Sequence, residues 1–367
     1  MNELKYTKSP EKLKIVELEK KHQITHPLSC KIIPEGIVLP YMEKNNKIHG
    51  GVIDKEGEFV DFSNFNENVG GGYEVEHVLS RKESAIFIGN IVYPAWGHAI
   101  TDDLKYLWWL LTDEFKRIYK EKKIVFVCIK SKYLKDLSSF FSLLSAFGIK
   151  SSSLMLIEEP TRFKEVYVPE SSFLATEDGK RFWSYEFDST INQIKDYFTL
   201  GTETFDKVYL SRTKIAGRRD FGEKYVEKAF KDANYHIVYP EEISLEQQIH
   251  ILKNAKTVVT TEGSISHNAV FMQKHATLVI LRKSDYINYY QVAINEMNDL
   301  NVVYIDAHLS VLNNKRTPIV GPFFIYVNSR VADFLGMKKS FPLFEFLRYI
   351  RWSLFHRDIL DRIRFLC

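Results

Sequence analysis

A basic loop follows an apolar run that predicts a buried strand at residues 207–210. The loop reads Ser-Arg-Thr-Lys-Ile-Ala-Gly-Arg-Arg over residues 211–219, with four cations and one glycine. Because arginine presents a planar fork that matches two phosphate oxygens, the loop predicts an anion site. Arg212 is the first candidate ligand since it is nearest the strand, and Arg218 and Arg219 come next. A solvated basic loop is the alternative.

Two further loops follow predicted strands and carry polar residues. Glu242 ends the stretch Tyr-Pro-Glu-Glu before an expected helix, where its carboxylate either complements the helix dipole or accepts ribose or sugar hydroxyls. The turn Glu262-Gly263-Ser264 follows the strand expected at residues 257–260 and precedes another helix. Backbone N–H groups at such a turn can hold a diphosphate. Ser264 would cap that helix, bond a phosphate oxygen, or do both.

Glu262 is the unusual member of this turn, because a carboxylate repels phosphate. It is better suited to accept a hydrogen bond from a hydroxyl or to act as a general base. His267 and Asn268 fall on the first turn of the expected helix. They either contribute to the anion site or are structural residues whose hydrogen bonds are satisfied within the fold.

In the first half of the chain, His98 and Asp102 are four residues apart, so on a helix they share a face. A carboxylate beside a histidine raises its basicity and fixes its tautomer, which suits a general base. A structural network at a helix start is the alternative. The pair lies at the beginning of residues 98–115, whose apolar spacing predicts a helix that includes Trp108 and Trp109.

The elements that would position these residues alternate between strand and helix. Short alternating runs broken by Asn-Asn and Gly-Gly turns predict a small strand-rich platform first. Apolar strands alternating with helices then predict parallel sheets covered on both faces, an α/β fold with two Rossmann-like lobes. The predicted strands lie at residues 124–129, 154–157, 165–168, 207–210, 236–239, 257–260, 277–281 and 302–305, and the helices at 98–115, 133–147, 187–198, 223–232 and 244–254.

A linker at residues 201–204 is expected to divide the lobes. Residues 1–203 would form the N-terminal lobe, on the acceptor side, with the platform at about 31–92 and an α/β part at about 93–203. Residues 204–310 would form the second lobe, and residues 311–367 a C-terminal extension. Ligands bind beyond the carboxyl ends of strands in open α/β sheets, so the second lobe, with its three polar loops, is the expected binding lobe.

The composition narrows the class of protein. A chain of 367 residues with 45% hydrophobic and 26% charged residues is ordinary for a soluble protein of one large or two mid-sized domains. A net charge of +3 is too small to indicate nucleic acid. Three scattered cysteines form no disulfide framework, which favours a reducing compartment. With no signal peptide and no apolar run of about 18–20 residues, we expect a cytoplasmic location.

Several motifs of other enzyme classes are missing. The sequence has no nucleophile elbow, Walker loop, zinc box or G-x-G-x-x-G fingerprint. The D-x-D pair typical of metal-dependent sugar transferases is not evident either, since Asp102 and Asp103 are adjacent. We therefore expect no cofactor, and we expect cationic side chains, not a metal ion, to neutralise a leaving diphosphate.

Four stretches together resemble glycosyltransferase family 61, including bacterial members from capsular polysaccharide loci. They are Gly97-His98 with Asp102, residues 209–212 with Arg218 or Arg219, residues 239–248, and residues 261–268. The resemblance spans about residues 85–285 and implies an inverting, metal-independent transferase with a two-lobed, GT-B-like fold. It also implies a nucleotide-sugar donor whose diphosphate is bound by Arg212. Many relatives have His-Gly-Ala where this chain has Glu262-Gly263-Ser264, so no role of that histidine is carried over.

The leading hypothesis is a glycosyltransferase of capsular or other cell-surface polysaccharide synthesis, acting on a glycan or lipid-linked glycan. The expected donor-binding residues are Arg212, Arg218, Arg219, Glu242, Gly263, Ser264, His267 and Asn268. The acceptor proton would pass to His98, oriented by Asp102, or to Glu262. A non-catalytic nucleotide- or glycan-binding protein of a membrane-associated assembly is the alternative, and the missing glycine fingerprint disfavours an oxidoreductase.

Residues 341–367 predict a basic amphipathic helix in which five arginines are interspersed with phenylalanine, leucine and tryptophan. Such a helix can lie in a membrane interface, which would place the protein on the inner face of the plasma membrane. The alternative is a helix packed across the two lobes.

Overall fold

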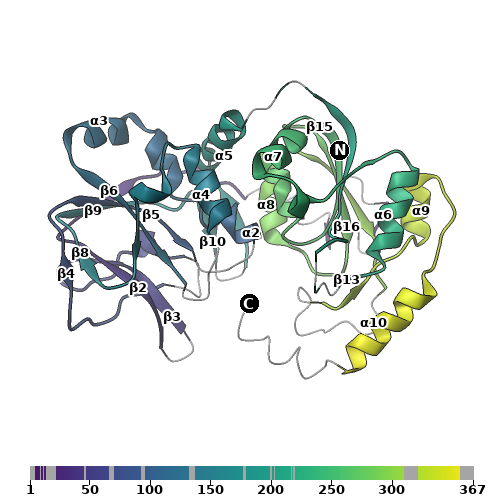
Figure 1. Cartoon of the computed structure of the whole chain (residues 1–367), viewed down its shortest axis with the longest axis horizontal. Helices are drawn as coiled ribbons and strands as arrows, with labels where there is room; N and C mark the ends of the chain where they lie inside the picture. Colours follow the sequence, from purple (N-terminus) through teal and green to yellow (C-terminus); the bar gives the residue numbers. More distant parts are fainter. Residues whose placement is uncertain are drawn as a thin grey trace. The chain divides into compact units, whose positions relative to one another are not determined.

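The computed structural model describes most of the chain as two compact units. The described residues are 5–8, 10, 12–13, 22–44, 47–65, 70–91, 96–131, 137–176, 179–198, 201, 203–215, 217, 220–309 and 321–355. The N-terminal unit is Lys21–Thr199, and the C-terminal unit joins Met1–Lys20 to Leu200–Cys367. Each unit is an α/β structure with its own sheets and core (Figure 1).

The N-terminal unit contains a mainly parallel sheet and a smaller mixed sheet. The larger sheet has the order β1-β9-β5-β6-β7, with β1 antiparallel to β9 and the other neighbours parallel. The smaller has the order β3-β2-β8-β4, and β10 and β11 pair separately. The strands are β1 (Cys30–Pro34), β2 (Ile37–Lys44), β3 (Lys47–Ile53), β4 (Leu79–Ser80), β5 (Ser84–Ile91), β6 (Ile124–Lys130), β7 (Leu154–Ile157), β8 (Thr161–Arg162), β9 (Glu165–Pro169), β10 (Phe173–Ala175) and β11 (Arg181–Trp183).

The expected platform over residues 31–92 differs from these sheets. Strands β1 and β5 belong to the larger sheet, and β8 joins the smaller one from outside the expected range. Every residue of β5 is buried, because this apolar strand is central and covered on both faces. The strands predicted at residues 124–129, 154–157 and 165–168 are confirmed as β6, β7 and β9.

The single helix expected over residues 98–115 is wrong. The structure has a four-residue helix, a run of turns, a 3-10 helix and then a second helix. The His98 carbonyl accepts from the amides of both Thr101 and Asp103, at 3.2 and 3.0 Å, which ends the first helix. Thr112 caps the second helix by accepting from the Phe115 amide. The helices of this unit are α2 (Trp96–Ala99), α3 (Asp113–Glu121), α4 (Ser138–Ser145) and α5 (Tyr185–Tyr197), with 3-10 helices η1 (Asp61–Ser63), η2 (Leu107–Leu111) and η3 (Ser151–Ser153).

The C-terminal unit is built on a parallel sheet with the order β14-β12-β15-β16-β17. The expected strands are confirmed as β12 (Phe205–Leu210), β14 (His236–Val238), β15 (Ala255–Thr261), β16 (Thr277–Arg282) and β17 (Asn301–Asp306). Helices α7 (Leu245–Lys253) and α8 (Tyr289–Met297) cover one face, and α6 (Glu223–Asp232) and α9 (Ser329–Leu335) cover the other (Figure 1). Helix α7 begins with a capping box, in which Ser244 and Gln247 exchange hydrogen bonds.

This strand order creates a switch point in the sheet. Numbered along the chain within the sheet, the order is 2-1-3-4-5, the flavodoxin-like order. The chain leaves β12 for β14 on one side and then returns past β12 to form β15 on the other side. In sheets of this order, ligands bind beyond the carboxyl ends of the strands at the switch point, which here lies between β12 and β15.

Residues at both ends of the chain belong to this unit, unlike the expected division. Asp306 at the end of β17 accepts hydrogen bonds from Thr7 Oγ1 and the Lys8 amide, so residues 5–8 belong here and not in the N-terminal lobe. Of the residues beyond 310, the described range 321–355 packs within this unit and forms no separate extension. Strand β13 (Asp220–Phe221) pairs with β18 (Phe323–Phe324), and a Cβ on Gly222 would overlap the Ile325 carbonyl oxygen. Helix α10 (Leu343–Phe355) then packs on β13 and β18.

Candidate functional site

The loop after β12 is fixed by two carboxylates of α6. Glu227 accepts hydrogen bonds from the hydroxyls of Ser211 and Thr213, each at 2.5 Å. Glu223 is buried and accepts from the Arg212 amide at 3.1 Å. These hydrogen bonds hold the backbone at the carboxyl end of β12. They therefore fix the position of Arg212, which lies between Ser211 and Thr213.

Arg212 is half-buried at this point, and its guanidinium forms no hydrogen bond or ion pair with any residue that the structure describes. A guanidinium held at the switch point without a carboxylate partner is well suited to bind an anion, because it can offer two parallel N–H donors. Arg218 and Arg219 lie outside the described residues.

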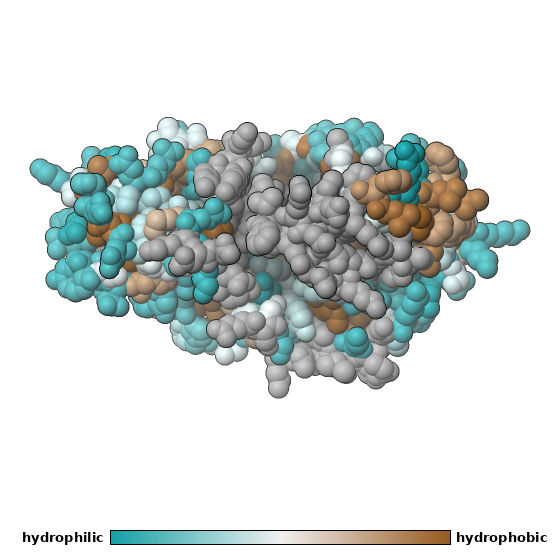
Figure 2. All heavy atoms as spheres, turned by 90° about the horizontal axis from the view of Figure 1, so that it is seen from below, coloured by the Kyte–Doolittle hydropathy of each residue, from teal (hydrophilic) through white to brown (hydrophobic). Residues whose placement is uncertain are grey.

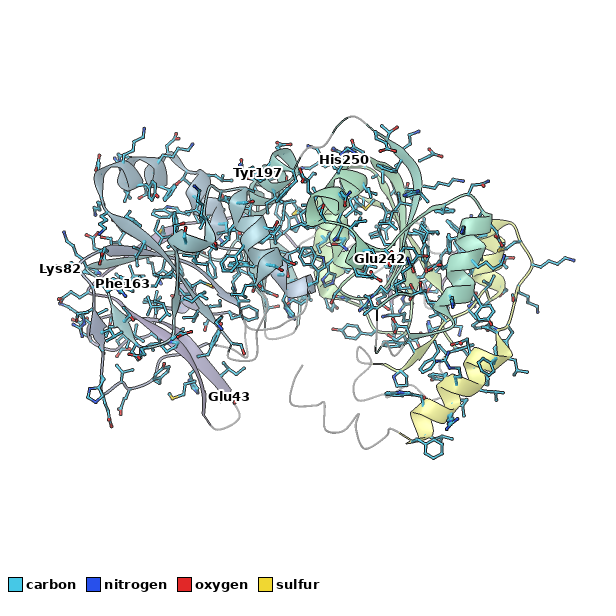
Figure 3. All side chains as sticks on the ribbon, in the orientation of Figure 1. Glu43, Lys82, Phe163, Tyr197, Glu242 and His250 are labelled. Atoms are coloured by element: carbon cyan, nitrogen blue, oxygen red, sulfur yellow. The ribbon has the colours of Figure 1, made fainter. Side chains whose placement is uncertain are left out.

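Glu242 lies in η4 (Pro240–Glu242), directly after β14, in the C-terminal unit (Figure 3). Its carboxylate is 2.6 Å from Lys214 Nζ, which also lies 3.9 Å from the centre of the Tyr239 ring. The structure therefore joins the predicted first and second loops. In this arrangement the Glu242 carboxylate neutralises Lys214, so Arg212 is left as the unpaired cation among the described residues of its loop.

The turn after β15 is closed by Ser266, not by Ser264. Gly263 has φ +120°, a conformation that favours glycine, and its carbonyl accepts from the Ser266 amide and hydroxyl at 2.8 and 2.7 Å. The segment that follows is a 3-10 helix, η5 (Ser266–Phe271), whose N-cap Ile265 makes no side-chain cap. The expected cap by Ser264 is therefore wrong, because the six-residue 3-10 helix begins after it.

Glu262 occupies the first position of this turn and lines a small cavity with Arg282, Tyr286 and Asn288. Its amide donates to the Leu281 carbonyl at 3.0 Å, and its carboxylate accepts from the Lys283 amide at 3.3 Å. Burial raises the pKa of Glu262 to about 7, against the opposing charge of Arg282. A carboxyl group with a pKa near neutrality can both take up and release a proton at physiological pH.

His267 and Asn268 are buried within η5. His267 Nε2 lies 3.0 Å from the Asn288 amide nitrogen, and its ring stacks on Tyr290 with centroids 5.6 Å apart. These contacts give His267 a packing role against the start of α8. The donor-binding role of either residue stays a prediction.

Sequence reasoning missed the charged residues at the ends of β16 and β17. Arg282 and Asp306 form an ion pair at 2.7 Å, with side chains 2% and 0% exposed. Lys283 is also buried, 3.4 Å from Asp220. A Cβ on Gly263 would lie 3.6 Å from Lys283 Nζ, so this ammonium is adjacent to the turn. The signal was present, because Arg282 ends an apolar strand and Lys283 follows it, much as Arg212 lies just beyond the end of β12.

In the N-terminal unit, the expected pairing of His98 with Asp102 is present. His98 Nδ1 lies 2.6 Å from Asp102 Oδ2, with the histidine partly exposed and the carboxylate buried. Burial alone would raise the pKa of Asp102, but the hydrogen bond and charge of His98 hold it below its usual value. Burial and the neighbouring Asp102 raise the pKa of Asp103 well above its usual range.

This arrangement sets the protonation of the pair. Its lowered pKa keeps Asp102 ionised at neutral pH, so its carboxylate can accept a hydrogen bond from the Nδ1–H tautomer of His98. The histidine ring is the member of the pair with access to solvent. Such a ring can take a proton from an approaching hydroxyl.

Among the described residues, no histidine, cysteine, aspartate and glutamate side chains gather in a group of three or more that could hold a metal ion. No helix among them has the length and apolar character needed to cross a membrane.

Solved structures and curated proteins give distant likenesses or none. A dodecameric iron-containing heptosyltransferase, TibC, solved in complex with ADP-D-beta-D-heptose, matches with 10% identity and a TM-score of 0.28, over 71% of this chain and 76% of that one. The bacterial dodecameric glycosyltransferase TibC from enterotoxigenic E. coli H10407 matches with 10% identity and a TM-score of 0.26, over 74% and 83%. No curated protein matches.

The sequence family is clear. The model of the family described as Glycosyltransferase 61 matches residues 96–279, half of the chain. The match includes His98 and Asp102, the Arg212 loop, and the turn that begins at Glu262. The protein is therefore a glycosyltransferase that belongs to glycosyltransferase family 61.

Proposed function

We propose that this glycosyltransferase moves a sugar, with inversion and without a metal ion, from a nucleotide-sugar to a hydroxyl of a glycan or lipid-linked glycan. The observation that carries the donor assignment is the position of Arg212. Its guanidinium lies without a described partner at the carboxyl end of β12, beside the switch point of the parallel sheet. Diphosphate is the anion that this place and a bidentate donor suit best.

The reaction would be a single displacement. The acceptor oxygen forms a bond to the anomeric carbon as the bond from that carbon to the diphosphate breaks, and the acceptor proton passes to a base. The leaving diphosphate gains negative charge, which Arg212 would stabilise, with Lys283 beside the Gly263 turn as a second cation. Arg218 and Arg219 remain predicted ligands of the same anion. These cationic side chains would supply the charge that a metal ion supplies in other transferases.

Two groups are candidates for the base, one in each unit. His98 is the first choice. Its Nδ1 atom lies beside the ionised Asp102 carboxylate, which would fix the tautomer, and its side chain is partly exposed to solvent. Glu262 has a pKa near 7 and lines a cavity. Each is testable by itself through its own substitution.

The proposed biological setting rests on the resemblance of the chain to family members from capsular polysaccharide loci. Family membership supports a role in capsular or other cell-surface polysaccharide synthesis, with the protein in the cytoplasm or on the inner face of the plasma membrane. The glycans of bacterial capsules are therefore the first acceptors to test.

The decisive experiment measures donor binding and transfer with Arg212→Ala. Thermal-shift and calorimetric titration against a panel of nucleoside diphosphates and their sugars would identify the donor. Losing a charge-assisted contact to phosphate is expected to weaken binding roughly 10- to 100-fold. Arg162→Ala, in half-buried β8 of the other unit, is the matched control and should bind like the wild type.

The outcome separates the alternatives. Unchanged diphosphate affinity in Arg212→Ala would contradict the donor site. Transfer that persists in excess EDTA is expected, and its loss would contradict metal independence. Tight donor binding without transfer or hydrolysis, with any glycan acceptor, would favour the non-catalytic binding protein.

A further inference from the structure

Helix α10 has an inward and an outward face of different character. Its inward residues Tyr349 and Ser353 are buried, and Tyr349 packs on Phe221 and Phe324 with ring centroids 5.9 and 5.7 Å apart. The helix is therefore fixed on β13 and β18 of the C-terminal unit through one side. Because this side is buried against the unit, the opposite side of α10 faces outward.

The outward face of α10 is mainly apolar. Five large side chains on it are between 54% and 77% exposed. They are Leu343, Phe344, Leu347, Leu354 and Phe355. Figure 2 shows hydrophobic residues gathered at the place of α10 on this side of the molecule. Scattered exposed apolar residues are normal, but a contiguous set on one helix face indicates an interaction surface.

The same face carries positive charge. Arg348 and Arg351 are exposed between the leucine and phenylalanine side chains. The acidic residue of the helix, Glu345, is mostly buried beside Arg348, at 2.6 Å. No described residue pairs with Arg351, and Lys338 and Lys339, just before the helix, are exposed too. Outward, the helix therefore offers apolar side chains and cations, with no exposed carboxylate.

We propose that this face of α10 binds the interface of an anionic lipid membrane. Leucine and phenylalanine side chains would enter the boundary between headgroups and acyl chains. Arginine stems would lie along the apolar layer while their guanidinium groups reach the lipid phosphates. The composition complements an anionic bilayer surface in both its apolar layer and its charge.

A second copy of the chain fits this face poorly. A two-fold dimer through α10 would place the same patch on both sides, so arginine would face arginine. No exposed carboxylate of α10 is available to separate them. Burial of the Arg351 guanidinium of each copy, which has no described carboxylate partner, is unfavourable, whereas lipid phosphates would neutralise it.

The test uses the full chain with vesicles of phosphatidylcholine alone or with an equal part of phosphatidylglycerol. We expect co-sedimentation with the anionic vesicles that weakens with salt. Phe344→Ser/Leu347→Ser should reduce binding about tenfold or more. Arg348→Gln/Arg351→Gln should reduce it about fivefold per arginine on anionic vesicles and little on neutral ones. Leu79→Ser, at a half-exposed leucine of the other unit, is the matched control and should bind like the wild type.

Three results would overturn the proposal: no wild-type binding to anionic vesicles, equal binding by the patch variants, or an effect as large in the control. Light scattering after gel filtration adds a fourth. If the patch substitutions convert a dimer to a monomer without changing vesicle binding, the occupant is a second copy.

All substituted side chains are exposed, so melting temperatures should stay close to wild type. Transfer to a soluble acceptor without vesicles should also be unchanged, which separates this proposal from the proposed function.

Discussion

Arg282 Nη1 lies 2.7 Å from Asp306 Oδ1, deep at the carboxyl edge of the C-terminal sheet. The same nitrogen donates to Thr7 Oγ1 at 3.3 Å, so this guanidinium is committed to its own pair. The charges of Arg282 and Asp306 both act on the nearby Glu262 carboxylate, but Glu262 forms no ion pair with any residue that the structure describes. Because Arg282 pairs with Asp306 and not with Glu262, burial raises the pKa of Glu262, and its carboxylate is not held permanently ionised by an ion pair.

The first prediction concerns the pH dependence that Glu262 would confer. If its ionised form is the base, kcat/KM rises with pH through about 7 and then levels, because burial raises the pKa to that value. Glu262→Gln should remove this limb and lower kcat roughly 100- to 10,000-fold, the range for a general base. Glu241→Gln, at an exposed glutamate of η4, is the matched control. A glutamine variant that keeps both rate and pH limb would exclude Glu262 and favour His98.

A second prediction links Asp306 to the same titration. The charge of Asp306 raises the pKa of Glu262, so Asp306→Asn should move any Glu262-dependent limb to lower pH. It should also destabilise the fold by about 3–5 kcal/mol, because Arg282 loses its buried partner. Urea unfolding and pH-rate profiles measure the two effects.

Thr7→Val is the control for that experiment, since it removes one hydrogen bond to Asp306 and keeps the charge. Its pH limb should stay in place. If the pH at which the rate of the Asp306→Asn variant rises is unchanged, or is higher than in the wild type, the electrostatic link between Asp306 and Glu262 is contradicted.

The sequence predicted the parallel part of the fold because its strands carry strong local signals. Strand β7 and helix α6 have the predicted bounds, since a short apolar run and a 3.6-residue period need no distant information. The pairing of β13 with β18 was missed, because two-residue strands have no periodicity. The break after α2 was missed too, since it depends on the His98 carbonyl accepting two amides.

Predictions for the site succeeded where chemistry and chain position coincide. Placing Arg212 after a predicted strand required only the local pattern. Lys283 was missed although it also follows a strand, because the loop after the strand predicted at residues 277–281 was not considered as part of the site. Its proximity to Gly263 and Asp220 depends on the order of strands, which apolar patterning does not specify.

A third prediction tests the orientation of His98 through Asp102. Asp102→Asn removes the carboxylate 2.6 Å from Nδ1, so the favoured tautomer is lost. If His98 is the base, kcat should fall at least about 100-fold with little change in the KM for the donor. Asp113→Asn, at a fully exposed aspartate of α3, is the matched control. A kcat within a few-fold of wild type would show that the pair is structural.

The same substitution has a consequence for stability. The folded-state pKa of Asp102 lies below its unfolded value, so the carboxylate stabilises the fold at neutral pH. This contribution is lost as pH falls through the folded-state pKa. Urea unfolding of wild type and Asp102→Asn should therefore differ at pH 7 and converge in acid, and a constant difference would contradict the linkage.

The last prediction concerns Lys283 as a second phosphate ligand. Lys283→Met keeps most of the side-chain volume and removes the ammonium beside the Gly263 turn. Losing a charge-assisted contact should weaken donor diphosphate binding roughly 10- to 100-fold. The single variant also leaves the buried Asp220 carboxylate without this cation, so a drop in stability is expected as well. The double variant Lys283→Met/Asp220→Asn separates the effects, because it restores stability without restoring the ammonium. Calorimetry that shows donor affinity recovering together with the melting temperature would mean that Lys283 serves the fold and not the donor.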